Sequence, residues 1–245
     1  MTVKKQSLSF KALATTSLLF LAGCAHVPDH VPMDKTFITQ DRDTPVEIAA
    51  GKIPKAESTT NGIQGLLDYA IISAMMSSLS DALENYKASD FYTITNDANT
   101  LLTKYHIKHA VLDKRLNIDT YPKFDGDIEK NKRYYSPVDY RRLKSEFGTN
   151  KLLVFNISQL GTTRKYYAFM PLEAPRTIAA LDGQLINLDS NEIIWRDSAN
   201  ITLKIEGEWD NPPDFPELKR SLSEAIDLGK SKILANLKAE LNSTR

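Results

Sequence analysis

The sequence predicts a mixed α+β fold in which helices cover a largely antiparallel sheet. Apolar residues recur at helical spacing near both ends of the body, and residues 151–205 have the pattern of paired strands with short turns. The 245 residues are 42% hydrophobic and 25% charged, which is typical of a globular protein. A formal net charge of zero gives no electrostatic reason to expect a nucleic-acid partner.

Residues 1–23 have the composition of an export signal. Three lysines, at positions 4, 5 and 11, precede an apolar run that is too short to span a bilayer. The segment Leu21-Ala22-Gly23-Cys24 contains the only cysteine of the chain and resembles the lipobox of bacterial lipoproteins. The resemblance implies cleavage between Gly23 and Cys24, a diacylglycerol on the Cys24 sulfur, and an added N-acyl chain such as palmitate. The alternative is an ordinary signal peptide with a chance cysteine.

Two or three acyl chains bind a membrane stably, so we expect an anchored protein that does not span the membrane. No later segment is long and apolar enough for a transmembrane helix. In bacterial lipoproteins of the enteric type, an aspartate directly after the lipidated cysteine implies retention in the inner membrane. This chain has Ala25 at that position. The resemblance therefore implies the outer membrane, with the body on its periplasmic face, although exposure at the cell surface stays open. We expect no cofactor beyond the covalent acyl chains.

Residues 24–61 are predicted to be the lipidated cysteine and a flexible tether. Four prolines, at positions 28, 32, 45 and 54, punctuate a polar stretch without periodicity. The alternative is that residues 46–50 form the first strand of the body, and both interpretations stay open. Residues 62–245 are then a single periplasmic domain.

The body is predicted to begin with one helix over residues 63–86, because apolar residues recur there at steps of three and four. Thr60 or Asn61 is the expected N-cap. Met75 and Met76 are expected to pack in the core.

Weaker patterns follow along the chain. They predict a short strand at 91–95, one or two helical turns at 99–105, a strand at 110–112, a polar loop at 119–137 and a helix at 138–147 that ends at Gly148.

The second half is predicted to be a β-meander. Residues 152–157 form a strand that is apolar on both faces, and residues 161–163 turn it into a second strand at 166–170. If Ser190 and Asn191 form the loop of the next hairpin, the opposing pairs include Ile186 with Trp195 and Ala180 with Ile201, so one side is apolar. A final helix follows Pro216, with Asp214 as its expected cap.

Two segments of this half resemble a known group of proteins. They are residues 181–195 (LDGQLINLDSNEIIW), a hairpin whose second strand ends in tryptophan, and residues 140–154 (YRRLKSEFGTNKLLV), a helix, a glycine and a buried strand. They resemble bacterial envelope lipoproteins, including the curli-secretion lipoprotein and the penicillin-binding-protein activator lipoproteins, whose fold is similar to the N-terminal domain of TolB. The resemblance covers roughly residues 138–205 and lacks the membrane-inserting hairpins of the secretion channel.

No nucleophile, phosphate-loop or zinc-protease motif is present, so we expect no enzyme. An alternative is an envelope hydrolase using Asp182 and Asp197, which the predicted register places diagonally on one side of the hairpin, with Gln184 opposite Asp197. His106, His109 and Asp113 could bind a metal only if residues 110–112 were helical, and we expect no metal site.

The leading hypothesis is a lipid-anchored protein that binds another envelope component, in an assembly, secretion or cell-wall accessory role. A second alternative is a subunit of an oligomeric outer-membrane secretion complex. Aromatic and arginine side chains gather in the middle third of the chain, as they do at protein interfaces. The expected contact residues are Tyr134, Arg141, Arg142, Arg164 and Tyr166.

Overall fold

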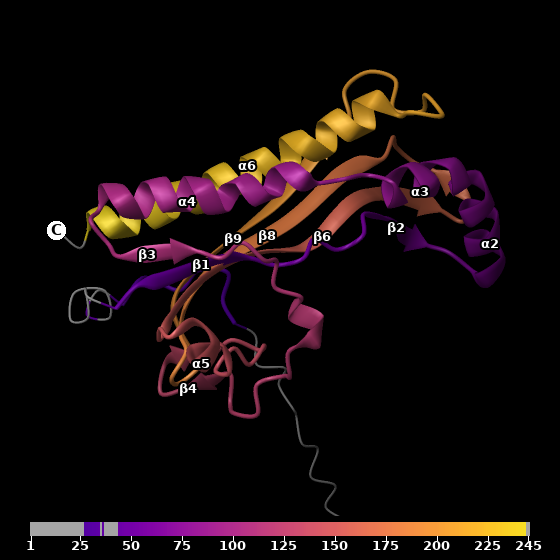
Figure 1. Cartoon of the computed structure of the whole chain (residues 1–245). Coiled ribbons are helices and arrows are strands. Elements are labelled where there is room, and N and C mark those ends of the chain that lie inside the picture. The colour runs from indigo at the N-terminus through magenta and orange to yellow at the C-terminus, as the bar shows by residue number, and fades with distance from the viewer. Residues whose placement is uncertain (1–26, 35, 37–43, 244–245) are drawn as a thin grey trace, which may run out of the picture.

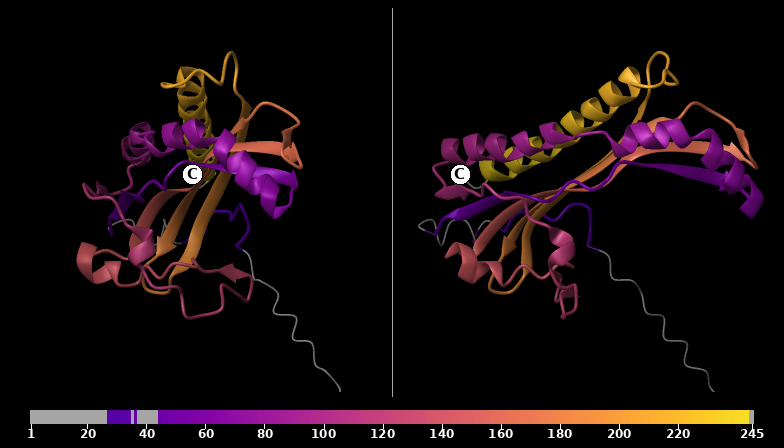
Figure 2. Two further views of the ribbon diagram at one scale, coloured as in Figure 1. Left: turned by 90° about the vertical axis from the view of Figure 1, so that its right-hand side faces the viewer. Right: turned by 45° about the vertical axis from the view of Figure 1, so that its right-hand side comes forward.

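The computed structural model describes residues 27–34, 36 and 44–243. The predicted export signal, Gly23 and Cys24 lie outside the described residues. A long mixed sheet forms the centre of the molecule, with helices on one face and mostly loops on the other (Figures 1 and 2). This confirms the predicted fold class. The strand order is β3-β1-β6-β8-β9, and β2 and β7 also pair with β6.

The strands of this sheet are β1 (Val46–Ala50), β2 (Glu57–Ile63), β3 (His109–Val111), β6 (Lys151–Tyr167), β7 (Met170–Pro171), β8 (Arg176–Asn187) and β9 (Glu192–Lys204). Two short strands, β4 (Glu129–Lys130) and β5 (Arg133–Tyr134), pair separately within the polar loop.

The predicted tether is too long. Residues 46–50 form β1, which lies between β3 and β6, so the strand alternative is correct. β2 covers residues 57–61 as well. The body therefore begins before residue 62, because Ile48, Ala49 and Ala50 are fully buried and supply apolar side chains to both faces of the sheet.

β6 continues through the turn predicted at residues 161–163. Gly161 has a φ of 142°, and a Cβ at this position would lie 1.8 Å from the Glu57 carbonyl oxygen. Glycine thus lets β2 pair with the second half of β6, after β1 has paired with the first half. The predicted turn was wrong because a glycine can mark either a turn or a position inside a strand where another backbone approaches closely.

The hairpin of β8 and β9 has a different register from the predicted one. Trp195 lies opposite Leu185, and Ile201 opposite Ala179. The loop has four residues, 188–191, and a bulge at Ile194 separates the pairs near the loop from the others. Relative to β9, each β8 residue that pairs beyond the bulge therefore lies on the opposite face of the sheet from the predicted one.

Two long helices cover the helix face of the sheet (Figure 1): α4 (Thr93–Lys104) and α6 (Pro216–Asn242). The apolar stripe of α6 is confirmed, with Leu218, Leu222, Ile226 and Ile233 buried. The helix packs closely on β8, since a Cβ on Gly183 would lie 2.9 Å from Ile233 Cγ2. The expected cap at Asp214 is wrong, because Phe215 occupies the N-cap position.

The first predicted helix is two helices, α2 (Leu66–Met75) and α3 (Ser77–Glu84), which meet at Met76. The N-cap is Gly65, whose N–H donates to the Asp68 carboxylate at 2.7 Å, so neither Thr60 nor Asn61 caps it. Met76 is buried as expected, whereas Met75 is 58% exposed.

The strand predicted at 91–95 is also wrong. These residues form the short 3-10 helix η1 (Ser89–Tyr92) and the start of α4. Phe91, Ile94 and Ala98 are fully buried at steps of three and four, which is a helical period.

Residues 112–150 cover the loop face near the hairpin end of the sheet. They contain the 3-10 helix η2 (Ile118–Thr120) and the short helix α5 (Leu143–Phe147), which ends at left-handed Gly148 as predicted but begins later than residue 138. Leu116, Tyr140 and Leu143 are buried here against Leu152, Val154 and Ile186.

Candidate functional site

The observed register separates the two predicted carboxylates. Asp182 lies opposite Ser198, and Asp197 lies opposite Gly183. Directly opposed residues share a face, and neighbouring residues along a strand do not, so Asp182 and Asp197 are on opposite faces of the sheet. Asp197 lies on the helix face, 3.7 Å from His30. The two carboxylates therefore do not meet as an acid–base pair, and the hydrolase alternative loses the pairing on which it was based.

Asp182 lies instead at a cavity of about 340 Å³ on the loop face. Apolar side chains supply much of its wall, and polar side chains from three adjacent strands form its floor. The lining residues are Val27, Ile118, Ile128, Ser136, Pro137, Val138, Tyr140, Asn156, Ile157, Ser158, Asp182, Gln184, Ile193 and Arg196. A concave site with convergent polar groups is the usual form of a small-ligand site.

The polar floor is a consequence of strand pairing. Asn156 of β6 lies opposite Asp182 of β8, and Gln184, two residues further along β8, lies opposite Arg196 of β9. Gln184 donates a hydrogen bond of 2.7 Å to the Asp182 carboxylate. The amide predicted to satisfy Asp197 therefore satisfies Asp182.

Several polar atoms of this floor are buried without a hydrogen-bond partner. They are Asn156 Oδ1, Gln184 Oε1 and Arg196 Nε. Asn156 is 6% exposed and Gln184 is 7% exposed. Burying such groups unpaired is costly, so an arrangement of this kind is expected where a bound molecule supplies the missing partners.

Burial also controls the charge of the floor. Desolvation raises the pKa of the Asp182 carboxyl, and the hydrogen bond from Gln184 and the positive charge of Arg196 oppose this rise in the pKa. Tyr140, which closes the cavity from the loop side, has a pKa raised mainly by burial, so its phenol stays protonated. The site thus has one guanidinium beside a carboxyl group whose pKa is raised by burial.

The first described residues cover one side of the cavity. Arg196 donates to the carbonyl oxygens of Val27 and Pro28 at 3.0 and 3.1 Å, and Val31 forms a β-bridge with Arg196. Val27 is 5% exposed and lines the cavity. Residues 27–31 are therefore part of the folded body and not of an extended tether.

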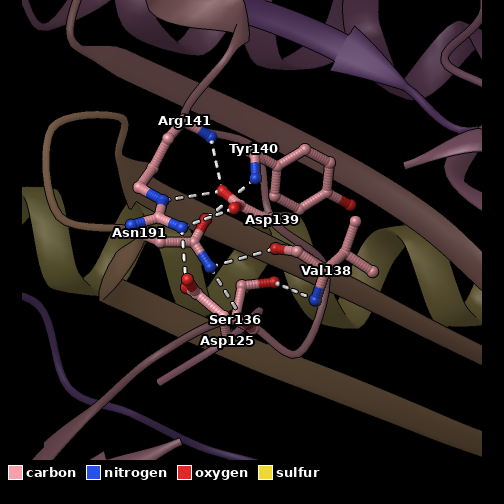
Figure 3. Close-up of polar contacts among 7 residues, drawn as sticks. All are labelled: Asp125, Ser136, Val138, Asp139, Tyr140, Arg141 and Asn191. Atoms are coloured by element: carbon pink, nitrogen blue, oxygen red, sulfur yellow. Dashed lines mark hydrogen bonds and ion pairs between the residues drawn. The ribbon is translucent and has the colours of Figure 1, made fainter. Parts of the chain in front are cut away.

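Arg141 belongs to a network that fixes the loop on the hairpin (Figure 3). Its guanidinium donates to Asp139 Oδ2 at 2.6 Å and to Asp125 Oδ1 at 2.8 Å. Beside it, Asn191 accepts a hydrogen bond from the Tyr140 N–H and donates to the carbonyls of Ser136 and Val138. This arrangement gives Arg141 a structural role, since its charge is already paired.

The other expected contact residues are spread over the molecule. Arg142 lies 4.0 Å from the Tyr121 ring centroid, and Arg164 lies 5.0 Å from that of Trp209. Tyr134 is half-buried against the small cluster around Ile193. Tyr166 is 2% exposed, and its hydroxyl lies 2.9 Å from Met76 Sδ. Tyr166 is therefore a core residue and offers no contact surface, which corrects the prediction.

The sequence analysis missed an exposed apolar surface at one end of the sheet, which we call the apolar tip. It is formed by the end of β2, by α2 and by the β6–β7 turn, and its large exposed side chains are Ile63, Leu66, Leu67, Tyr69, Met75, Tyr167, Phe169, Met170 and Leu172. One signal was available: residues 166–172 contain no charged residue, and residues 61–76 contain only Asp68.

The histidine alternative has no geometric support. Residues 109–111 form strand β3, and His109 contacts Asn99 Oδ1 at 2.9 Å through its Nε2. Within the described part of the chain, no group of three His, Cys, Asp or Glu side chains is placed to hold a metal ion.

Comparison with known proteins gives structural similarity at low sequence identity. No family model and no curated protein matches the chain. Among solved structures, lipoprotein GNA1162 from Neisseria meningitidis is 11% identical with a TM-score of 0.31, covering 76% of this chain and 100% of that one. The PelC dodecamer from Paraburkholderia phytofirmans is 10% identical with a TM-score of 0.32, covering 80% and 89%. The hypothetical protein CT253 from Chlamydia trachomatis is 9% identical with a TM-score of 0.34, covering 81% and 99%.

Proposed function

We propose that this chain is a lipid-anchored protein of the outer membrane that catalyses no reaction and binds another envelope component in the loop-face cavity. The observation that supports it most directly is the set of unpaired, buried polar atoms at the floor of that cavity. Buried donors and acceptors without partners destabilise a core, whereas in a binding site they can form hydrogen bonds with the bound molecule.

The chemistry of the floor favours an uncharged polar group on the bound component. The two amide oxygens would accept hydrogen bonds, and Arg196 Nε would donate one. A bound cation would meet the guanidinium of Arg196, and a bound anion would lie beside Asp182. A hydroxyl or amide group avoids both repulsions, and the apolar wall suits a partner whose remaining surface is apolar.

The position of the cavity supports a role at the membrane. Only residues 25 and 26 separate Cys24 from Val27, which lines the cavity. Three peptide units span at most about 11 Å. With acyl chains on Cys24, the cavity therefore lies close to the membrane, on the periplasmic side in this proposal.

One observation favours the alternative of an oligomeric secretion subunit. Among the described strands β2 pairs only with β6, which leaves its other edge open to a strand from another chain. Light scattering after size-exclusion chromatography distinguishes the two. A monomer at high concentration contradicts the oligomeric alternative.

In-cell photo-crosslinking tests the binding site. A benzoyl-phenylalanine replaces Ser158, an exposed residue that lines the cavity. The matched control replaces Ser231, which is exposed on α6. We expect an adduct from position 158 that is absent from position 231 and is lost when Gln184→Leu is added. Equal adducts from both positions, or none from position 158, would contradict cavity binding.

The anchor is tested separately. Wild-type cells should incorporate labelled palmitate into the protein, and Cys24→Ala should abolish the label and leave an unprocessed precursor. Label that persists in Cys24→Ala would remove the lipid anchor from the proposal without affecting the cavity.

A further inference from the structure

The apolar tip exposes side chains that soluble proteins normally bury. Leu66 is 94% exposed, Ile63 is 78% exposed and Leu67 is 75% exposed. Single exposed apolar residues are common, but a contiguous exposed patch marks a surface that another molecule covers. The tip lies at the opposite end of the sheet from α5 and the loops of residues 112–150 (Figures 1 and 2).

Exposed apolar residues lie on several sides of the helix at the tip. Among the ten residues of α2, only Asp68 and Ser73 are polar, and Asp68 is already engaged at the N-terminus of the helix. Ile72 is the only one of its residues that is buried against the body. A protein partner would cover one face of such a helix and leave apolar residues on the others, whereas hydrocarbon surrounds a helix on all exposed sides.

The β6–β7 turn beside α2 has the composition of a membrane interface. Residues 166–172 carry no charge, and Tyr167 and Phe169 are exposed among aliphatic neighbours. Tyrosine is enriched where a membrane protein passes from hydrocarbon to water. Lys165, directly before this segment, is exposed and can hold its charge at the level of the headgroups.

The length of α2 limits how deep the tip can go. Ten residues at about 1.5 Å each extend about 15 Å, which is half of the ~30 Å hydrocarbon core. Within the described residues no single helix is long and apolar enough to cross a membrane, although α2 taken together with residues 77–104 passes by length and composition, with a bend of 65°.

We propose that the apolar tip inserts into one leaflet of a lipid bilayer. β6 runs from the cavity at Asn156 to the tip at Tyr167, which is about 36 Å at ~3.3 Å per residue. The protein would then contact its membrane at two points, through Cys24 near the cavity and through the tip. The first of these contacts rests on the proposed function, and the second does not.

A local fluorescent probe tests insertion without the lipid anchor. In the full chain carrying Cys24→Ser, a single cysteine at Leu66→Cys is labelled with an environment-sensitive nitrobenzoxadiazole dye. Vesicles of phosphatidylethanolamine and phosphatidylglycerol are added. We expect a blue-shifted emission that rises several-fold and is quenched by nitroxides on the lipid acyl chains. The same dye at Ser231→Cys on α6 should not respond.

The double variant Leu67→Asp, Phe169→Asp should abolish the response at position 66. Both residues are exposed, so the fold should be retained, as circular dichroism can check. A dye response that depends on protein concentration and not on vesicles would overturn the proposal in favour of a second copy of the chain. No response under either condition would also overturn it. Because Cys24 is absent, neither outcome bears on lipidation or on cavity binding.

Discussion

The two faces of the central sheet are covered in different ways. On the helix face, α6 places a regular stripe against β8 and β9, and the contact is so close that Gly183 has no room for a side chain. On the loop face, residues 112–150 cover the sheet through specific hydrogen bonds and leave a cavity of about 340 Å³ over polar side chains. The helix face thus serves stability, whereas the loop face has the features of a binding site.

This contrast predicts the largest loss of stability on the helix face. Phe155 is fully buried there and contacts the Gly183 position. Phe155→Ala should lower the free energy of unfolding by about 3–5 kcal/mol, because it removes a large buried side chain and leaves a void. Urea denaturation followed by circular dichroism measures this. The control is Tyr167→Ala on the same strand, 58% exposed, which should change stability by less than about 0.5 kcal/mol.

On the loop face, Asn191→Ala should have the next largest effect. Its side chain makes three hydrogen bonds to the backbone of residues 136–140, and its φ is 65°. We expect a loss of about 2–3 kcal/mol, from the unpaired backbone groups and from the left-handed backbone. Asn191→Gly relieves only the backbone strain, so it should lie between wild type and alanine. Equal stability of all three proteins would show that the loop is held by other contacts.

Arg141→Ala should lower the stability less than Asn191→Ala does, because the ion pairs of Arg141 are partly exposed to solvent. The Arg141 guanidinium lowers the pKa of the Asp139 carboxyl below its ordinary value. A lowered native pKa contributes stability above pH 4 that is lost as the pH falls through the native pKa. The difference between Arg141→Ala and wild type should therefore shrink on acidification. A difference that grows at low pH would contradict the pairing.

Asp182→Asn should change stability least, and in the opposite direction. Burial raises the native pKa of Asp182, so its unfavourable ionisation lowers the stability of the wild type as the pH rises from about 4 through the raised pKa. Asparagine does not ionise and can still accept from Gln184. The variant should match wild type at pH 4 and be slightly more stable at pH 7. Thermal unfolding across this range measures the slope, and an unchanged slope would contradict the raised pKa.

The sequence predicted those parts of the fold in which one period dominates. The buried stripe of α6 and the strand at 152–157 follow from the pattern of apolar residues alone. Residues 66–75 were harder, because a stretch with so few polar residues fits a buried helix as well as it fits an exposed one. Burial depends on what lies above the helix, and only the structure shows that α2 projects beyond the sheet.

The candidate site could not be predicted because it depends on the register of one hairpin. A four-residue loop ending in left-handed Asn191, together with the bulge at Ile194, places Asp182 and Asp197 on opposite faces. Apolar residues such as Leu181 and Ile186 occur at both odd and even positions of β8, so the pattern permits either register. Of the contact residues expected from composition, Tyr166 is buried and Arg141 is ion-paired, neither of which composition alone reveals.

The hydrogen bonds from Arg196 to the carbonyl oxygens of Val27 and Pro28 also affect how the protein would encounter a binding partner. With acyl chains on Cys24, so short a connection leaves the body unable to search the depth of the periplasm, in contrast to lipoproteins on long linkers. In that proposed arrangement, molecules diffusing in the same membrane would meet the cavity at a high effective concentration, because both would be confined to a thin layer. Even a weak intrinsic affinity would then give high occupancy, and a binding measurement on the protein released from the membrane would underestimate it.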